Sequence, residues 1–522
     1  MKKSVSIILA LVMVFALMMS ACGSSSSAPA TEAAPAAETT EAAPAKDVLT
    51  IAHFGDVVTL DPHGTQSTVT NLVKVNIFEN LVKQEADGSI VPELAESWEQ
   101  VDDTTYIFKL RQDVKFSNGE GMTAEDVVYS LARSAASPTT SALAGMIDYE
   151  NCKVIDEYTV EFKTLQPYAP ILAHLAQECI AIVSKNVTEA NDGEVDKEPV
   201  GTGPYMLSEW VTGDHLTLVE NPNYWGEKPF IPTVLFRIIP EGSTRTLELE
   251  SGGVDIVLDL PESDVVRVQA NNKLVVDKAS NFYNYHVYLN QKNEYLQNEN
   301  IRKAIACALD RNAIVQVASE GNKVPLYGYL CSGVWGYSDD IEKYEYDLDR
   351  AKEYMAAAGY PDGGFELDFL CNSANIYVTA GEIIQNMLKE IGITVTISAT
   401  DSGGALERLY SGNYDMAINT WVAVAGDPDY GMYPVFHSSM TTSGNLSGVN
   451  DPKVDELLEA GRYEPDSEKR LAIYAELQAY LAEKAYDLPM WEDVNINAYQ
   501  SNVKGFVNDA NKFYHFNTVY FE

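Results

Sequence analysis

The stretch Trp421–Tyr430 (WVAVAGDPDY) carries two carboxylates, Asp427 and Asp429, on either side of a proline. Such a pair could serve as the acid and base of a secreted hydrolase such as a glycosidase, contribute to a metal loop, or belong to the wall of a binding pocket. The proline sets a turn between the two carboxylates, and no neighbouring residue indicates a raised pKa for either. A catalytic acid pair is therefore the interpretation that fits least well.

Motifs of known catalytic chemistry do not occur elsewhere in the sequence. It has no phosphate-binding P-loop, zinc-protease motif or serine-hydrolase motif, and Gly201-Thr-Gly-Pro204 lacks the third glycine of a dinucleotide loop. The seven histidines are scattered, with no two at helical i, i+4 spacing. We therefore predict that the protein is not an enzyme and holds neither a metal nor a cofactor.

The start of the chain predicts export. Lys2 and Lys3 precede an apolar run at 7–19, which is short for a membrane-spanning helix and typical of a secretory signal. The run ends in Met19–Gly23 (MSACG), which resembles a bacterial lipobox, although leucine is usual where Met19 stands. We predict that residues 1–22 include a lipoprotein signal peptide and that Cys22 is acylated. The alternative is an uncleaved anchor with an incidental Cys22.

Residues 23–46 predict a disordered tether. They contain no aromatic and no large aliphatic residue, so they cannot bury enough apolar surface to offset the entropy of ordering. Together with acyl chains on Cys22, such a tether would hold a folded body outside the cell membrane, on its extracytoplasmic face.

The remainder has the composition of a folded protein, because the 522-residue chain is 46% hydrophobic and 10% aromatic. Its length predicts two or three lobes. The formal net charge of −40 argues against nucleic acid or anionic lipid as a ligand. Apart from Cys22, five cysteines are widely spaced; Cys152 and Cys179 could pair, but buried free thiols are favoured.

Hydropathy patterns alternate between strand and helix along the chain, which predicts an α/β fold. Strands are predicted at 48–52, 106–111, 158–163 and 392–398, and 488–491 reads as a buried turn or strand. Helices are predicted from 123, over 301–318 and 347–359, around Ile383–Met387, and around Ile473–Leu481.

Nine sequence blocks resemble the extracytoplasmic solute-binding proteins of family 5, which serve peptide/nickel-type ABC importers. They are Leu60–His63, Val91–Trp98, Phe108–Phe116, Thr123–Ser130, Gly201–Tyr205, Asn221–Trp225, Ser251–Ile256, Ile301–Arg311 and Ala351–Tyr360. The blocks occur in the order of that family, and the resemblance covers 47–522.

This resemblance implies a two-lobed periplasmic-binding-protein-like fold of the large, cluster C type, with an additional domain and a hinged cleft. Domain I would comprise 47–90, 199–285 and 495–522, domain II would be 91–198, and domain III would be 286–494. The hinge would lie near 283–290 and 491–498. The implied partners are a small solute, a peptide by preference, and the permease and ATPase of an ABC transporter, and we expect a monomer.

In relatives of this kind, the counterpart of Trp421 lies beside the ligand. Dipeptide and oligopeptide binders typically place an aspartate a few residues later, where it takes the α-ammonium of the peptide. Here Val422, Ala423, Val424 and Ala425 follow the tryptophan, and none of them can form a salt bridge. The earlier strand, 367–377, also lacks the arginine that dipeptide binders tend to carry for the ligand carboxylate.

Two interpretations of the ligand site therefore remain. In the favoured one, Trp421, Val422, Ala423 and Val424 form an apolar wall. Further aromatic walls would come from Tyr283, Tyr285, Phe54 and Tyr377. In the other, Asp427 turns into the cleft and replaces the missing aspartate.

The resulting functional hypothesis is a lipid-anchored receptor that captures a solute by lobe closure and delivers it to a permease. A peptide is the favoured ligand, and a neutral non-peptide solute such as an oligosaccharide is the main alternative. Nickel is disfavoured by the lack of a histidine cluster. A hydrolase that uses Asp427 and Asp429, and an adhesive or signalling lipoprotein without hinge closure, are the other classes.

Overall fold

The computed structural model describes residues 46–65, 67–85, 88–441 and 443–522. Lys46–Glu522 form one compact unit. The predicted signal peptide, the acylated Cys22 and nearly all of the tether lie outside the described residues. In the described part, no helix combines the length and the apolar character needed to cross a bilayer.

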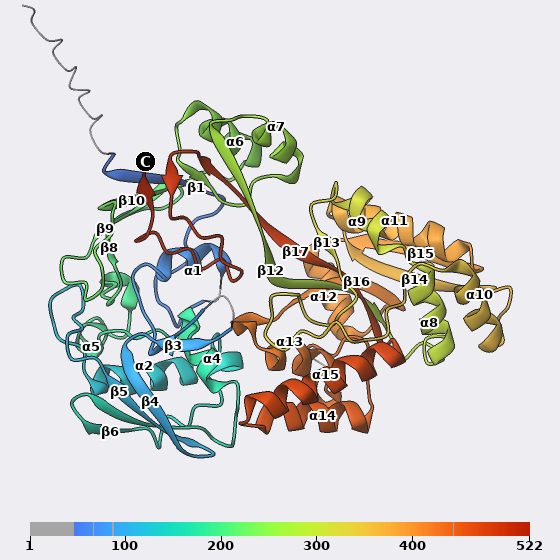
Figure 1. Ribbon diagram of the computed structural model, residues 1–522, viewed down its shortest axis with the longest axis horizontal. Helices are drawn as coiled ribbons and strands as arrows, with labels where there is room; N and C mark the ends of the chain where they lie inside the picture. Colours follow the sequence, from blue (N-terminus) through green and yellow to red (C-terminus); the bar gives the residue numbers. More distant parts are fainter. Residues whose placement is uncertain (1–45, 66, 86–87, 442) are drawn as a thin grey trace, which may run out of the picture. The chain divides into compact units, whose positions relative to one another are not determined.

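An 11-stranded mixed sheet runs through this unit (Figure 1). Its strand order is β15-β14-β16-β12-β17-β11-β1-β10-β9-β8, and β13 pairs with β17 off this path. The strands are β1 (Val48–His53), β8 (Tyr205–Val211), β9 (His215–Glu220), β10 (Thr233–Ile238), β11 (Ile256–Val257), β12 (Leu274–Leu289), β13 (Val324–Pro325), β14 (Phe365–Asn372), β15 (Ile393–Thr400), β16 (Met416–Val422) and β17 (Asp487–Gln500).

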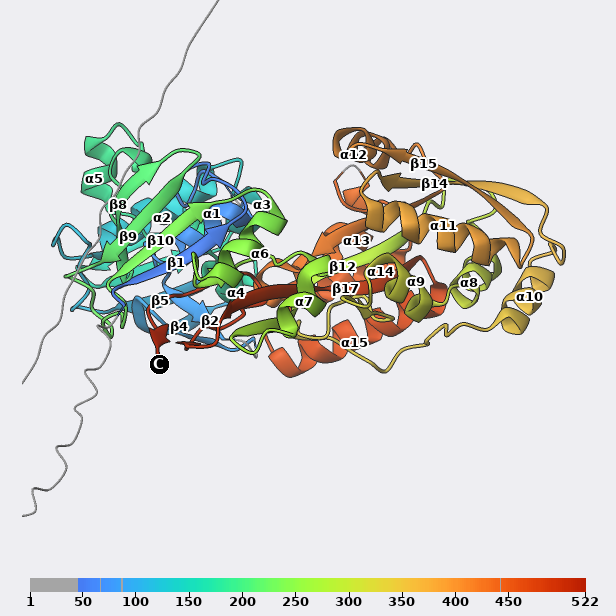
Figure 2. The ribbon, with the colours of Figure 1, turned by 90° about the horizontal axis from the view of Figure 1, so that it is seen from above.

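Two long strands, β12 and β17, join the two halves of this sheet, and both views show them running side by side (Figures 1 and 2). The early part of β12 pairs with the late part of β17, which also pairs with β11. The late part of β12 pairs with β16 on its other side. The register of β12 against β17 shifts between Ser280 and Asn284, so the hydrogen-bond ladder between these two strands is irregular where the two halves of the sheet meet.

Smaller sheets and helices complete the fold. The other strands form a four-stranded sheet in the order β4-β5-β7-β6 and the two-stranded sheets β2-β3 and β18-β19. Their bounds are β2 (Val82–Gln84), β3 (Ile90–Pro92), β4 (Ala95–Asp102), β5 (Thr105–Leu110), β6 (Lys153–Asp156), β7 (Thr159–Lys163), β18 (Val503–Lys504) and β19 (Tyr520–Phe521). The α-helices are α1 (Thr68–Lys74), α2 (Ala124–Ala136), α3 (Ser141–Ala144), α4 (Ile171–Leu175), α5 (Lys185–Ala190), α6 (Gly242–Ser251), α7 (Val265–Gln269), α8 (Glu299–Ala308), α9 (Arg311–Ala318), α10 (Leu348–Ala357), α11 (Asn375–Lys389), α12 (Ser402–Ser411), α13 (Pro428–Phe436), α14 (Pro452–Tyr463) and α15 (Ser467–Lys484).

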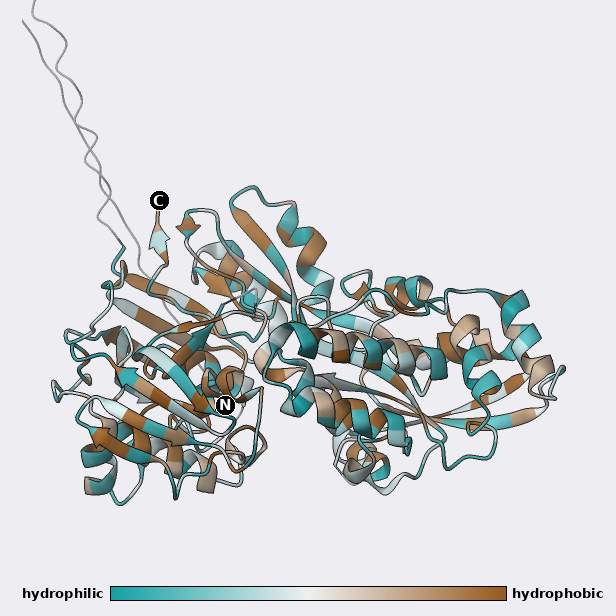
Figure 3. Ribbon diagram, turned by 60° about the horizontal axis from the view of Figure 1, so that its bottom comes forward, coloured by the Kyte–Doolittle hydropathy of each residue, from teal (hydrophilic) through white to brown (hydrophobic). Residues whose placement is uncertain are grey.

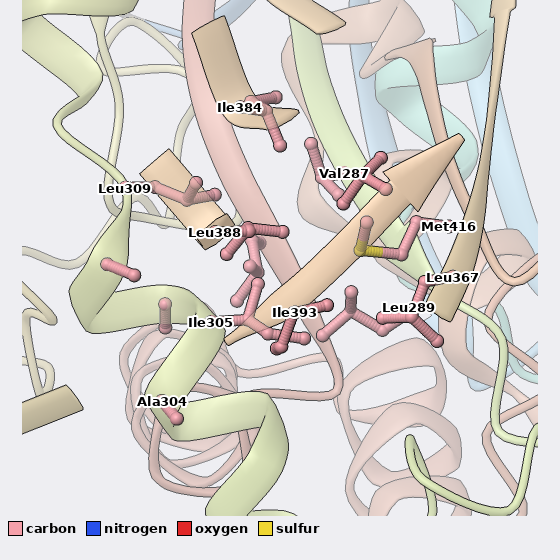
Figure 4. Packing of buried hydrophobic residues seen from close by; sticks show 14 of the residues in the cluster. Val287, Leu289, Ala304, Ile305, Leu309, Leu367, Ile384, Leu388, Ile393 and Met416 are labelled. Atoms are coloured by element: carbon pink, nitrogen blue, oxygen red, sulfur yellow. The ribbon is translucent and has the colours of Figure 1, made fainter. Parts of the chain in front are cut away.

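The hydrophobic core is divided rather than continuous. One cluster fills the space around β1, β9 and β10, a second lies under the four-stranded sheet and α2, and a third joins α8 and α11 to β12, β14 and β15. In the third, Ile305, Leu388 and Ile393 point toward one another (Figure 4). Burying each such side chain stabilises the fold by roughly 1.5–3 kcal/mol. Hydrophobic and hydrophilic residues alternate along the helices of the folded unit (Figure 3).

Local signals predicted several of the helices and strands. Thr123 caps α2 in a capping box with Asp126, and Asp347 caps α10, so both helices begin where they were predicted. The single helix predicted over 301–318 was wrong, because the chain becomes extended at Leu309 and Asp310 begins a new helix. The Asp310 side chain accepts a hydrogen bond from the backbone of Ala313 at 3.0 Å, which fixes this second start.

The cysteines of the described part are free and buried, and they include Cys152 and Cys179. The alternative in which these two form a disulfide is therefore not realised. Burial raises the pKa of the Cys152 thiol to about 11, which is typical of a structural rather than a reactive cysteine.

Candidate functional site

The stretch Trp421–Tyr430 begins at the end of β16. Trp421 and Val422 are its last residues and pair with Asn284 and Tyr283 of β12. Beyond them the strand gives way to a short 3₁₀ turn, η4 (Val424–Gly426), and then to α13. The stretch is therefore held against β12, at the join between the two halves of the sheet.

Hydrogen bonds fix the wall that this stretch forms. The Ala423 amide donates to the carbonyl of Phe282 at 3.0 Å. The Trp421 indole donates from Nε1 to the Tyr430 carbonyl at 2.9 Å, and its ring lies 6.4 Å from that of Tyr430. Ala423 is buried, whereas Trp421 and Val424 are half-buried. Val424 packs on the cluster under the four-stranded sheet, so this wall touches that core.

Asp427 forms an ion pair with a buried arginine. Arg470, on α15, donates from Nη1 and Nη2 to the two carboxylate oxygens of Asp427 at 2.6 and 2.7 Å. One of these oxygens also accepts from the Asp429 amide at 2.8 Å, which caps α13. Burial by itself would raise the pKa of Asp427, but the Arg470 charge outweighs it and holds this pKa below its usual range.

Asp429 has the same kind of partner. Arg462, on α14, donates to both of its oxygens at 2.8 Å, and the Tyr168 hydroxyl donates to one of them at 3.3 Å. A general acid needs a raised pKa and a carboxyl free to reach the substrate. Asp427, with its lowered pKa and its bidentate partner, has neither. A role for Asp427 as a ligand contact is opposed by the burial of its carboxylate and by its bidentate pairing with Arg470.

The predicted aromatic walls fall into separate groups. Tyr285 stacks on Trp491 at 5.1 Å between ring centroids, and the ring of Tyr377, from α11, lies 6.0 Å from that of Tyr285. Burial and the neighbouring Tyr377 raise the pKa of Tyr285 well above its usual range. Tyr283 is half-buried on β12, beside Val422 of β16.

Phe54 comes from the other half of the sheet. It directly follows β1, and its ring lies 5.2 Å from that of His53. The structure thus brings Tyr283 together with Val422 and groups Tyr285 with Tyr377. Trp421 pairs with Asn284 instead, so its side chain is on the other face of the sheet.

A cavity of about 250 Å³ lies next to the wall. Phe282 and Gly426, the neighbours of predicted residues, contribute to it. Sequence reasoning missed its remaining residues, most of which come from the β2–β3 hairpin and from a polar run before the C-terminus, with Ser280 from β12 and Gly333 from a loop. The lining comprises Gln84, Glu85, Gly88, Ser280, Phe282, Gly333, Gly426, Val507, Asn508, Asp509, Ala510 and Asn511. The run of Asn508, Asp509 and Asn511 was the one available signal, and it is common in ordinary loops.

Metal chemistry has no visible site here. In the described ranges, no three or more histidine, cysteine, aspartate or glutamate side chains are grouped to hold a metal ion. The arrangement as a whole can grip a solute between an apolar wall and a polar cavity, with its carboxylate–arginine pairs serving as supports.

Comparison with known proteins identifies the class first. The fold matches the ABC transporter-associated periplasmic binding protein DppA from Helicobacter pylori, solved in complex with the peptide STSA, with a TM-score of 0.73 and 29% identity. The match covers 91% of this chain and 98% of that one. The protein thus has the two-lobed fold of periplasmic binding proteins, as predicted.

The family follows from the sequence comparison. Residues 89–443 match the family described as "Bacterial extracellular solute-binding proteins, family 5 Middle". The Dipeptide-binding protein of Escherichia coli K12 is 26% identical over 489 residues, covering 88% of this chain and 91% of that protein. The "Probable D,D-dipeptide-binding periplasmic protein DdpA" of the same organism is 31% identical over 445 residues, covering 82% and 85%. This chain belongs to the family 5 solute-binding proteins.

Proposed function

We propose that the protein is an extracytoplasmic receptor that captures a peptide between its lobes and delivers it to the permease of an ABC transporter. Family membership supports the solute-binding role, and similarity to proteins named for dipeptide binding supports the ligand class. Closure of the lobes around β12 and β17 would bury the peptide and create the surface that a permease recognises.

The pairing of Asp427 and Asp429 with two arginines is the observation that carries the proposed mode of capture. With both carboxylates engaged, the wall after β16 offers the Trp421 ring, apolar side chains and its backbone. A wall of this kind can hold a peptide by its main chain and its shape. We therefore include Trp421, Val422, Ala423, Val424 and Tyr283 in the proposed site and treat Asp427 as a support.

The domains predicted from the resemblance are part of this proposal. Separate hydrophobic clusters around β1 and under the four-stranded sheet support domains I and II, and two more, around β14 and around α13–α15, support domain III. The paired strands β12 and β17 would supply the hinge, because their shifted register interrupts the ladder between Ser280 and Asn284.

A thermal-shift experiment tests the proposed capture. The full-length protein, purified in detergent and refolded to remove bound solute, is heated with peptide, glycan and metal libraries. We expect a peptide to raise the melting midpoint and Trp421→Ala to abolish the gain. Trp210→Ala is the matched control, because Trp210 is also half-buried and its indole also makes one hydrogen bond, to Asp56 at 3.1 Å. Shifts from a neutral glycan and from no peptide would overturn the peptide assignment.

We further propose that Cys22 carries the lipid that anchors the receptor to the cell membrane. The support is the lipobox-like Met19–Gly23 and the apolar run before it. We expect the native chain to sediment with membranes and Cys22→Ala to be released from them. Equal sedimentation of the two would mean that an uncleaved apolar segment provides the anchor.

A further inference from the structure

The cavity beside the wall is enclosed by parts of the chain that are far apart in sequence. The β2–β3 hairpin contributes Glu85, β12 contributes Ser280, and the segment before the C-terminus contributes Asp509. Glycines at 88, 333 and 426 bring backbone to its surface. The cavity can therefore admit a small group of a larger ligand.

Asparagines hold the C-terminal side of the cavity in place. Asn495 of β17 donates from Nδ2 to the Asp509 carbonyl at 2.8 Å, and Asn497 donates to the Asn508 side chain at 2.9 Å. Asn508 in turn donates to the carbonyl of Asp277 on β12 at 3.2 Å. These bonds tie the segment to both long strands, so Asp509 is presented by a rigid support.

The Asp509 carboxylate is itself fixed. One of its oxygens accepts from the backbone amides of Asn511 and Phe513 at 2.8 and 3.1 Å. Burial raises the pKa of Asp509 above its ordinary value, although the two amides and the charge of Lys83 oppose the rise. In the described part of the chain, no lysine, arginine or histidine lies within 4.0 Å of this carboxylate. Its charge is therefore poorly compensated.

A second carboxylate lies behind the cavity. Glu492 is 2% exposed and accepts hydrogen bonds from the hydroxyls of Ser280 and Ser332 and from the Ser332 amide, at 2.8 to 2.9 Å. It too has no cationic partner within ion-pair distance among the residues that the structure describes. Buried carboxylates are usually paired with a cation, so the unpaired Glu492 adds negative potential on this side of the cavity.

Lys83, which precedes the lining residue Gln84, only partly offsets this negative potential. Lys83 lies 3.4 Å from Glu85, and the side chains of both are about half exposed. Solvent screens such a pair, whereas the buried Glu492 and the fixed Asp509 are screened less. The cavity thus carries more negative charge than its own residues neutralise.

We propose that this cavity holds an ammonium group of the ligand, which donates to the Asp509 carboxylate while Glu492 and Glu85 supply the surrounding negative potential. The inference rests on the proposed peptide function and specifies which end of the peptide enters the cavity. A free α-ammonium there would replace solvent as the partner of Asp509 and make a charge-assisted hydrogen bond. The apolar wall at 421–424 would then contact the peptide beyond its first residue.

Chemical variation of the ligand tests this inference without altering the protein. A peptide that binds in the thermal-shift assay, and that lacks lysine, arginine and histidine, is made with a free, an N-methylated and an N-acetylated terminus. Titration calorimetry on the full-length protein should give similar affinities for the free and methylated forms, which keep the charge. The acetylated form should bind about 10- to 100-fold more weakly.

Variants of the protein provide the second arm. Asp509→Asn should weaken binding of the free-amine peptide about 10- to 100-fold and leave binding of the acetylated peptide unchanged. Asp362→Asn, at an exposed loop aspartate, is the matched control and should change neither. Equal affinity of the native protein for free and acetylated peptides would overturn the ammonium assignment and leave peptide capture intact. Failure of every peptide to bind would overturn the proposed function itself.

Discussion

Breaking the Asp427–Arg470 pair should destabilise the protein by about 3–5 kcal/mol, because removal of one partner leaves the other charge buried and uncompensated. The two side chains are 6% and 5% exposed, and their two hydrogen bonds measure 2.6 and 2.7 Å. Asp427→Asn would leave the Arg470 guanidinium buried without a carboxylate partner. The guanidinium would retain one hydrogen bond, from Nε to the Gly461 carbonyl at 2.8 Å. The cap of α13 can persist in this variant, because an asparagine oxygen also accepts a hydrogen bond from the Asp429 amide.

Urea unfolding, followed by tryptophan fluorescence, measures this cost. The matched control is Glu342→Gln, which removes the partner of Arg350 in an exposed pair with a 2.5 Å contact. Exposed pairs of this kind contribute about 0–1 kcal/mol, so the control should barely change the free energy of unfolding. The double variant Asp427→Asn/Arg470→Met removes both charges and should be less destabilised than the sum of the two single variants.

The pH dependence has a definite sign. Because the pKa of Asp427 in the folded state lies below its unfolded value, the stability it contributes is present above that unfolded value, near pH 4. It is lost as the pH falls through the lower folded-state pKa. A cost for Asp427→Asn as small as that of Glu342→Gln would refute the reasoning. So would a loss of ligand affinity at unchanged stability, because that result would make Asp427 a ligand contact.

Two further predictions concern stability. His63 accepts a hydrogen bond at Nδ1 from Arg133 at 2.8 Å and bonds the Ala181 carbonyl through Nε2 at 3.0 Å, so it is held neutral. Burial and the Arg133 charge lower its pKa to about 4, below the unfolded value near 6.5. The unfolded state therefore binds more protons between these values. Lowering the pH from 6.5 to 5 should reduce the free energy of unfolding of the native protein by about 2 kcal/mol more than it reduces that of the His63→Gln variant. Equal losses in urea unfolding at the two pH values would contradict this account. Gly201→Ala should cost about 1–3 kcal/mol or more, because its Cβ would lie 2.0 Å from the Ile77 carbonyl oxygen. Gly121→Ala, whose Cβ would meet nothing within 4 Å, is the control, and similar melting midpoints for the two variants would show that the backbone relaxes around Gly201.

The sequence by itself determined the local elements and the family. Short-range rules were sufficient for β1, for the capping of α2 by Thr123 and for the capping of α10 by Asp347, because the groups that decide these features are close in the chain. The family was recognisable because its blocks recur in order. The break between α8 and α9 also has a local cause, because the Asp310 side chain caps α9. The helical spacing of apolar residues on both sides of Asp310 led to the prediction of one continuous helix.

The tertiary structure alone decided the roles of the polar groups. Asp427 finds its partner 43 positions away, on α15, and no spacing rule connects the two residues. The cavity joins residues near 85, 280, 426 and 509, which meet because β12 and β17 pair along their length. Hydropathy patterns report which face of an element is buried, but not which distant element covers it. Whether a carboxylate is neutralised or left without a cation depends on that second fact, which only packing determines.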